Sequence, residues 1–175
     1  MLKIGTSLFN YVIAVTRRHR PDLDDLGLLS LLHELGRADD VSTWLRRVLR
    51  HADLPPPWDG TETIKPLRTV AEIQMTGIEL RNCLFGDDHS LPAVLGECCY
   101  YRVSGRYGPA VVSVTFDALL GASRIESYRG PANAPVNPAA ARYIIEAFAA
   151  AGIRFFGEYP RERALEDLDG FYPPP

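Results

Sequence analysis

The sequence predicts an α+β protein: an N-terminal helical unit, then a helix, an antiparallel three-stranded sheet and a further helix. Apolar residues recur at helical spacings of three and four in residues 7–52 and again in 69–84. Alternating β-branched and aromatic runs then fill much of residues 98–128, and helical spacing returns after Asn137. The chain has 175 residues, 46% of them hydrophobic, so it can bury a sizeable core.

A proline-rich stretch divides this pattern. Leu54-Pro-Pro-Pro-Trp-Asp-Gly60 interrupts the helical periodicity, and consecutive prolines lack amide donors and favour an extended connection. Trp58, inside the stretch, is expected to pack on the domain because an indole buries a large area. The expected segments are a helical unit over 1–53, a Pro-rich connection over 54–66, an α+β core over 67–157 and a C-terminal tail over 158–175.

Three helices are expected in the N-terminal unit, each beginning near a residue whose side chain can cap it. Ser7 caps the first, Asp22 the second, and Asp39 or Asp40 the third. The residues expected on their core-facing stripes are Leu8, Val12 and Val15; Leu26, Leu29, Leu32 and Leu35; and Val41, Trp44, Leu45, Val48 and Leu49.

The helix that opens the α+β core begins with the capping-box sequence Thr69-Val-Ala-Glu72. Its apolar stripe consists of Val70, Ile73, Gly77, Leu80 and Leu84. A glycine in mid-helix costs roughly 1 kcal/mol relative to alanine, so we expect another backbone to cross closely at Gly77.

Three strands follow, at Cys98–Val103, Ala110–Phe116 and Ser123–Tyr128. Their short connections favour antiparallel pairing. One face of the second strand carries Val112, Val114 and Phe116. We expect these side chains to pack against Ile73, Leu80 and Phe148, with only one sheet face apolar.

In the third strand, alternation predicts that Ile125 faces one side while Arg124, Glu126 and Tyr128 face the other. Asn137 is then the N-cap of a final helix with Pro138 in its first turn. The expected inward residues of that helix are Ile144, Ile145 and Phe148, and a short strand at Ile153–Phe156 follows it.

Composition and charge exclude several classes. A net charge of −3 argues against a broad nucleic-acid-coating surface. Cys83, Cys98 and Cys99 form no C-x-x-C pair and the histidines lack ligand spacing, so we expect reduced thiols and no metal site. No signal peptide, membrane span or phosphate- or dinucleotide-binding motif is visible, which predicts a cytoplasmic protein without a cofactor or membrane partner.

Two stretches hold the candidate site: residues 126–135, where a strand runs into a Gly/Pro-rich loop, and residues 80–83. A guanidinium fork matches carboxylate or phosphate, so Arg129 is the expected anion clamp. Glu126 and Cys83 are the candidate catalytic residues, as proton acceptor and thiol. The expected ligand-binding residues are Asn82, Arg102, Glu126, Tyr128, Arg129 and Asn133.

Each of these residues also has a plain structural interpretation. Glu126 and Arg124 can form a solvated ion pair on a sheet face, which contributes little to stability. Cys83 can be a packed structural thiol, and Asn133 can lock its own loop by bonding to backbone. The loop that follows Arg129 raises the weight of the functional interpretation.

Part of the chain resembles the PcfJ-like family of bacterial conjugative plasmids, phages and other mobile elements. The resemblance covers about residues 67–152, and the N-terminal unit lies outside it. It rests on Gly77-Ile-Glu-Leu-Arg-Asn-Cys83, on Tyr100-Tyr-Arg-Val103 and Val111–Phe116, and on Ile125…Arg129-Gly130…Asn133. A His commonly precedes the Cys in that family; because Asn82 stands there in this chain, no Cys–His mechanism is carried over.

Three functions follow as expectations. The leading one is a non-catalytic binding or adaptor protein of a mobile-element or phage-related system that holds a protein partner or a small anionic ligand at residues 129–133. The alternative is a hydrolase or transferase for a nucleotide-like substrate, with Glu126 as general base and Arg129 on the phosphate. A cleft joining Asn82 or Cys83 to these two residues would favour the enzyme, and a flat surface the adaptor.

The third and least favoured function is nucleic-acid binding through two arginine groups of the N-terminal unit. Together they would form one basic patch if their helices are neighbours. The residues are Arg17, Arg18, Arg20, Arg46, Arg47 and Arg50.

Overall fold

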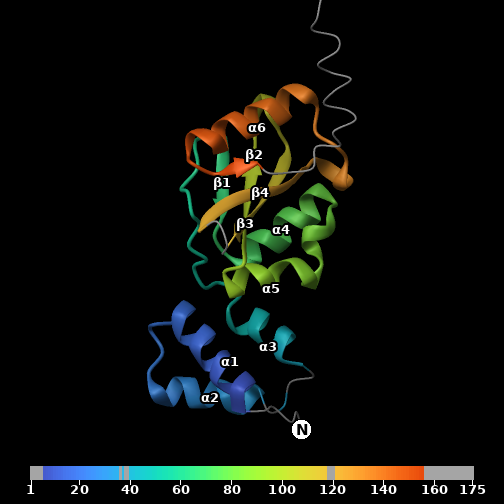
Figure 1. Ribbon diagram of the computed structural model, residues 1–175. Coiled ribbons are helices and arrows are strands. Elements are labelled where there is room, and N and C mark those ends of the chain that lie inside the picture. The colour runs from blue at the N-terminus through green and yellow to red at the C-terminus, as the bar shows by residue number, and fades with distance from the viewer. Residues whose placement is uncertain (1–5, 36, 38–39, 118–120, 156–175) are drawn as a thin grey trace, which may run out of the picture.

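The protein is an α+β structure in a computed structural model that describes residues 6–35, 37, 40–117 and 121–155. Three helices form the N-terminal unit, and a mixed sheet with helices on both faces forms the rest (Figure 1). The described helices are α1 (Thr6–His19), α2 (Asp25–Leu35), α3 (Val41–Val48), α4 (Val70–Leu80), α5 (Asp87–Leu95) and α6 (Pro138–Ala150), with short 3₁₀ turns η1 (Cys83–Phe85), η2 (Gly105–Tyr107) and η3 (Pro131–Asn133). None of these described helices is long and apolar enough to cross a membrane.

The sheet has the strand order β1-β2-β3-β4-β5 along the described chain. Its strands are β1 (Ile64–Leu67), β2 (Cys98–Val103), β3 (Ala110–Asp117), β4 (Ala122–Arg129) and β5 (Arg154–Phe155). Neighbours pair antiparallel except β4 and β5, which are parallel. The three predicted central strands are confirmed, and β5 is the predicted final strand, whose last expected residue, Phe156, lies outside the described residues.

Strand β1 was not predicted. It contains Pro66, which cannot donate to a ladder and therefore suits an edge strand, where it pairs with Tyr101. Because β1 spans residue 66, the sequence-based division between connection and core falls inside a strand, and that division stays a prediction.

Both faces of the sheet are covered. On the face under α6, Val112, Val114 and Ile125 pack with Ile144 and Phe148. The expectation of a single apolar face, with Val112 and Val114 against α4, is therefore wrong, although their predicted packing with Phe148 is confirmed. The two layers of helices enclose the sheet (Figure 1).

The opposite face packs on α4 and α5 through Tyr100 and Val111, together with Ile73 and Leu80 of α4. Phe116 belongs to neither cluster and is 57% exposed, so its predicted burial is also wrong. It pairs with Ser123 near the end of the β3–β4 hairpin, two residues beyond Val114, the last β3 residue in the core.

The predicted helix starts are confirmed for α3, α4 and α6 but are wrong for the first two helices. Ser7 lies inside α1, and Asp24 rather than Asp22 accepts from the Gly27 amide in the first turn of α2. Asp40 caps α3 by accepting from the Thr43 amide, and Thr69 and Glu72 form a reciprocal capping box at α4. Asn137 caps α6 with Pro138 in its first turn.

The close backbone crossing expected at Gly77 is confirmed. A Cβ at Gly77 would collide with the backbone nitrogen of Phe85 in η1. Glycine therefore lets the chain fold back against α4 directly after it ends, which brings η1 beside the sheet.

The stripes expected in the first two helices are only partly right. Leu35 is buried, but Leu26 and Leu29 are exposed and Leu28 is buried instead. Helix α2 has leucine at so many positions that periodicity alone does not select one face. Leu8 of α1 is likewise exposed, whereas the predicted stripe of α3 lies in the core.

Helix α5 was missed in the sequence. Pro92 lies inside it, and glycines stand next to both of its ends, at positions 86 and 96, so the stretch has the composition of a loop. Helix α5 nevertheless packs in the core: Ala93 and Val94 are buried in the cluster that joins the N-terminal helices to the sheet. It supplies one wall of the site described below.

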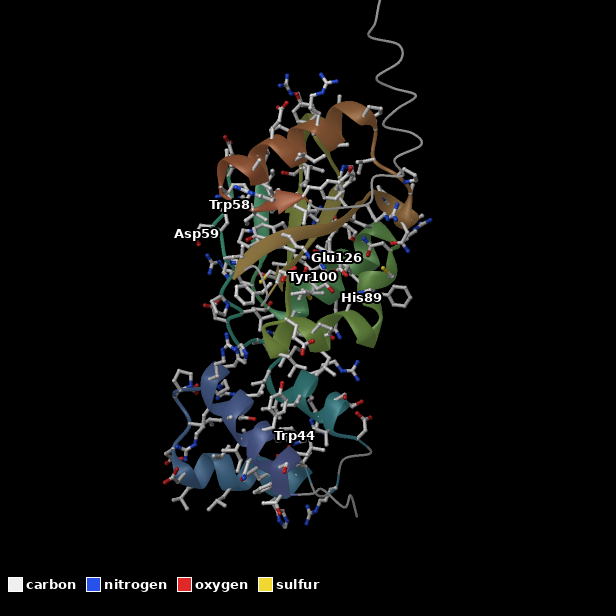
Figure 2. The ribbon with its side chains drawn as sticks, in the orientation of Figure 1. Trp44, Trp58, Asp59, His89, Tyr100 and Glu126 are labelled. Atoms are coloured by element: carbon white, nitrogen blue, oxygen red, sulfur yellow. The ribbon has the colours of Figure 1, made fainter. Side chains whose placement is uncertain are left out.

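Two contacts join the N-terminal unit and the Pro-rich connection to helices that pack on the sheet. The buried His19 of α1 places Nδ1 3.1 Å from the Asp53 carbonyl oxygen and Nε2 2.7 Å from that of Val94 in α5. Trp58 packs its ring 4.9 Å, centroid to centroid, from that of Phe148, which confirms the predicted structural role (Figure 2).

Candidate functional site

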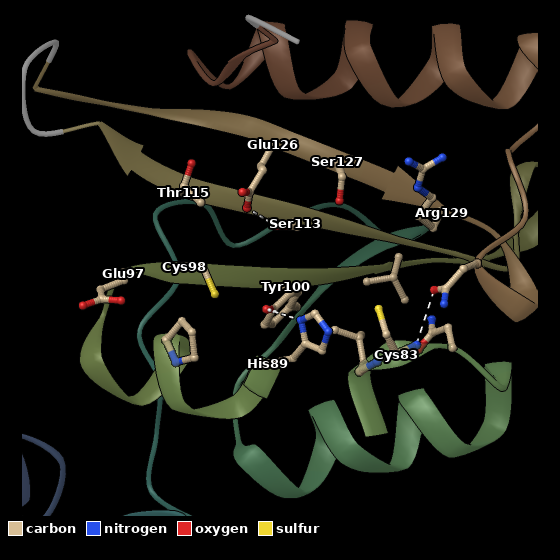
Figure 3. A pocket seen from close by; sticks show the side chains of 15 residues that line it. Cys83, His89, Glu97, Cys98, Tyr100, Ser113, Thr115, Glu126, Ser127 and Arg129 are labelled. Carbon is tan, nitrogen blue, oxygen red and sulfur yellow. Dashed lines mark hydrogen bonds between the residues drawn. The ribbon is translucent and has the colours of Figure 1, made fainter. Parts of the chain in front are cut away.

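A pocket of about 470 Å³ lies between the sheet and the η1–α5 segment (Figure 3). Strands β3 and β4 form its upper rim and helix α5 with turn η1 its lower rim, with β2 behind. Its lining residues are Asn82, Cys83, Leu84, His89, Pro92, Glu97, Cys98, Tyr100, Val111, Ser113, Thr115, Glu126, Ser127, Arg129 and Asn133.

A β-bulge in β4 sets which side chains reach the pocket. Ser113 pairs with Ser127, but the next β3 residue, Val114, pairs with Ile125, so Glu126 is the extra residue. Glu126 and Ser127 therefore both line the pocket although they are adjacent in sequence.

The bulge also reverses the alternation beyond it. Tyr128 was predicted to share a face with Glu126, and this is wrong. It packs on the α6 side, with its ring centroid 5.6 Å from that of Phe155. Arg129 consequently lines the pocket. A bulge adds one residue without changing residue types, so nothing in the strand sequence announced it.

Glu126 accepts a hydrogen bond from the Ser113 hydroxyl at 3.0 Å. The predicted ion pair between Glu126 and Arg124 is not formed; Arg124 Nε lies 4.0 Å from Asp117 instead. Deeper in the pocket wall, the Thr115 hydroxyl is buried and has no hydrogen-bond partner among the described residues. This end of the pocket is rich in acceptors.

The opposite end presents hydrogen-bond donors. Asn82 is only 3% exposed, and its side-chain oxygen accepts from the Leu84 amide at 3.1 Å. The Asn133 oxygen accepts from the Cys83 amide at 3.3 Å. Each oxygen accepts from a backbone amide, so the NH₂ group of each is a donor for which no acceptor occurs among the described residues, and both residues line the pocket.

Arg129 lies at this same end (Figure 3). Its side chain is exposed, and it forms no ion pair with any residue that the structure describes. In Figure 3 its guanidinium extends away from Cys83 along the rim, so a change of rotamer would be needed to bring it over the pocket.

The centre of the pocket is aromatic. The Tyr100 hydroxyl lies 3.5 Å from His89 Nδ1, a weak contact, and the two rings meet edge to face. Burial raises the pKa of Tyr100 and raises that of Cys98 to about 11, so both groups keep their protons at neutral pH.

Cys83 differs from its predicted packed state, because it is exposed at the pocket rim. It does not end helix α4; Arg81 closes α4 in a left-handed conformation, and Cys83 begins η1. Cys98 and Cys99 project to opposite faces of β2.

Arg102 lies outside the pocket, contrary to prediction. Its guanidinium makes two 2.6 Å hydrogen bonds to the Glu79 carboxylate of α4, and this contact lowers the pKa of Glu79. Sequence reasoning also missed His89, Tyr100 and Ser113. Ser113 is a polar residue among the valines of β3, and this was the one sequence signal for a polar position on the pocket face. His89 gave no signal because it belongs to helix α5, which was not predicted.

Four of the six N-terminal arginines make contacts within the protein. Arg17, Arg20 and Arg47 pair with Asp25, Asp22 and Glu34, respectively. Arg46 is buried and donates to the Ser42 carbonyl and the Thr43 hydroxyl.

Comparison with known proteins identifies no relative: no family model, curated protein or solved structure matches the chain. The PcfJ-like resemblance thus stays a prediction from short motifs. No group of three or more His, Cys, Asp or Glu side chains that could hold a metal occurs within the described ranges. The chemistry of the pocket is the basis for inferring function.

Proposed function

We propose that the protein binds a small anionic molecule in this pocket, with the anionic group at the Asn82–Asn133–Arg129 end. The observation that carries the proposal is the orientation of the two asparagines. Backbone amides occupy both of their oxygens, so this end offers NH₂ donors and a guanidinium to a ligand.

The shape supports a small molecule over a protein partner at this site. A volume of about 470 Å³ lies within the usual range for small-ligand pockets, which combine an apolar lining with a few fixed polar groups. A flat surface was expected for an adaptor and a cleft for an enzyme. The four residues Asn82, Cys83, Glu126 and Arg129 line a cleft, so a catalytic role is also considered. We also propose that the protein belongs to a mobile-element or phage-related system, and only the PcfJ-like resemblance supports this part.

A catalytic role is the second candidate. The Glu126 carboxylate lines the same cleft as Arg129 and accepts a hydrogen bond from the Ser113 hydroxyl at 3.0 Å, so it is a candidate proton acceptor for a substrate bound in that cleft. The reaction class would be hydrolysis or transfer on a nucleotide-like substrate. Phosphate release from nucleoside triphosphates, measured for the native protein and Glu126→Gln, separates the two candidates: turnover lost in the variant supports catalysis, and binding without turnover in either protein contradicts it.

Isothermal titration with inorganic phosphate and with nucleoside monophosphates tests the binding proposal. Arg129→Ala should weaken nucleotide binding by about tenfold or more, and Arg129→Lys should recover only part of it because lysine lacks the planar fork. Arg142→Ala, an exposed arginine on α6 outside the pocket, is the matched control. Absence of binding by the native protein, or equal loss in the control, would refute the proposal.

A further inference from the structure

The acceptor end of the pocket restricts what the rest of the ligand can be. Glu126 is exposed at the bulge, and one of its oxygens accepts a hydrogen bond from the Ser113 hydroxyl at 3.0 Å. An ionised carboxylate only accepts hydrogen bonds and has about four acceptor positions. Glu126 forms no ion pair within the described chain, so most of this capacity faces the pocket.

The two ends are separated along one strand. Glu126 and Arg129 both line the pocket from β4, three residues apart, and three strand residues span roughly 10 Å. A ligand that uses both ends must carry an acidic group and a hydrogen-bond-donating edge at about that separation. A nucleoside monophosphate has these dimensions.

The surface between the ends is suited to a flat ring. Tyr100, Leu84 and Val111 supply apolar area, and the rings of Tyr100 and His89 lie between Glu126 and Cys83 (Figure 3). Bases stack on aromatic side chains with little dependence on their identity. Stacking therefore favours a base without choosing among the bases.

The Glu126 carboxylate discriminates among the bases. Guanine is the common base whose pairing edge presents two adjacent donors, its ring N1–H and its exocyclic NH₂, to the two oxygens of a carboxylate. Adenine places an acceptor, its ring N1, beside its amino group, and that lone pair would repel the carboxylate. Resting on the anion site proposed above, we infer that the ligand is a guanine nucleotide, with its base edge on Glu126 and its phosphate on Asn82, Asn133 and Arg129.

Isothermal titration of GMP, IMP and AMP against the native protein tests the inference. GMP should bind about tenfold or more tightly than AMP, because hydrogen bonds to a charged group discriminate strongly. IMP, which keeps N1–H but lacks the amino group, should fall between them. Equal affinity for GMP and AMP would overturn the guanine assignment while leaving the anion site in place.

Glu126→Gln supplies the second arm. The amide has the same shape but presents one donor and one acceptor, so GMP affinity should fall. AMP affinity should rise, because the adenine N1 lone pair then meets a donor instead of a carboxylate. Glu146→Gln on α6, outside the pocket, is the control and should alter neither. If Glu126→Gln, with an unchanged melting temperature, keeps the preference for GMP, Glu126 does not read the base. If neither nucleotide nor phosphate binds the native protein, the anion site itself is refuted.

Discussion

The side-chain oxygen of Asn133 accepts a hydrogen bond from the backbone amide of Cys83, 50 residues earlier in the chain. This bond ties turn η3, after the last antiparallel strand, to turn η1, after helix α4. It closes one end of the pocket and leaves the Asn133 NH₂ as a donor. One side chain thus links the fold of the loop to the chemistry of the site.

The two roles of Asn133 can be separated by replacing it with aspartate. Asn133→Asp keeps an oxygen that can accept from the Cys83 amide, so the free energy of unfolding should change by less than about 1 kcal/mol. It removes the NH₂ donor and adds a negative charge, so binding of GMP and AMP should fall by about tenfold or more. Titration calorimetry with a denaturant titration measures both. A large loss of stability with binding intact would contradict the assignment.

The neighbouring residue is strained. Ala132 has φ 53°, in the left-handed region that costs an L-residue roughly 1–2 kcal/mol. Ala132→Gly should therefore raise the free energy of unfolding, by up to about 1 kcal/mol after the entropy of glycine in the unfolded chain is subtracted. Ala14→Gly, at an exposed position inside α1, should lower it by about 1 kcal/mol. If both variants lose stability equally in denaturant titration, η3 does not hold Ala132 in that conformation.

The elements that sequence could predict are those with local causes. The capping residues Asp40, Thr69 and Asn137 announce their helices because the cap is made within three residues. The three central strands follow from β-branched runs between short turns. The close crossing at Gly77 also followed, because a mid-helix glycine has a cost that packing can explain.

The parts that sequence could not predict depend on contacts distant in the chain. Helix α5 contains Pro92 yet forms, with Ala93 and Val94 buried in a core cluster made by residues distant in the chain. The bulge at Glu126 shifts Tyr128 away from the pocket and Arg129 toward it, and no residue type marks it. The structure brings three predicted site residues, Asn82, Asn133 and Arg129, to one end of the pocket, whereas nothing in the sequence indicated the aromatic centre.

Two phenylalanines provide a matched test of the sheet's packing. Phe148 of α6 is fully buried against the rings of Trp58 and Tyr101, so Phe148→Ala should cost about 3–5 kcal/mol. Phe116 is 57% exposed, and Phe116→Ala should cost less than about 1 kcal/mol. Urea titration of the two variants decides the ranking. Similar losses would show that the end of the β3–β4 hairpin is covered in solution.

The different burial of the three cysteines predicts how the free energy of unfolding depends on pH and in which order the thiols are alkylated. Burial raises the pKa of the Cys98 thiol from 9.0 to about 11, and burial also raises the pKa of Cys99 and Tyr100. Between pH 9 and 11, the unfolded chain releases the Cys98 proton while the folded protein keeps it. The free energy of unfolding should accordingly fall as pH rises through this window. Cys98→Ala should make that fall shallower.

Alkylation at pH 8 measures the same burial directly, since the thiolate is the reacting form. Iodoacetamide should label the exposed Cys83 first, and the buried Cys98 only when the chain unfolds, as mass spectrometry of digested protein would show. Bound GMP should slow the labelling of Cys83, because that residue lines the pocket, and leave the order of the others unchanged. Labelling of Cys98 as fast as Cys83 in folded protein would mean that the floor of the pocket opens, and a stability curve flat from pH 9 to 11 would exclude the burial of its thiol.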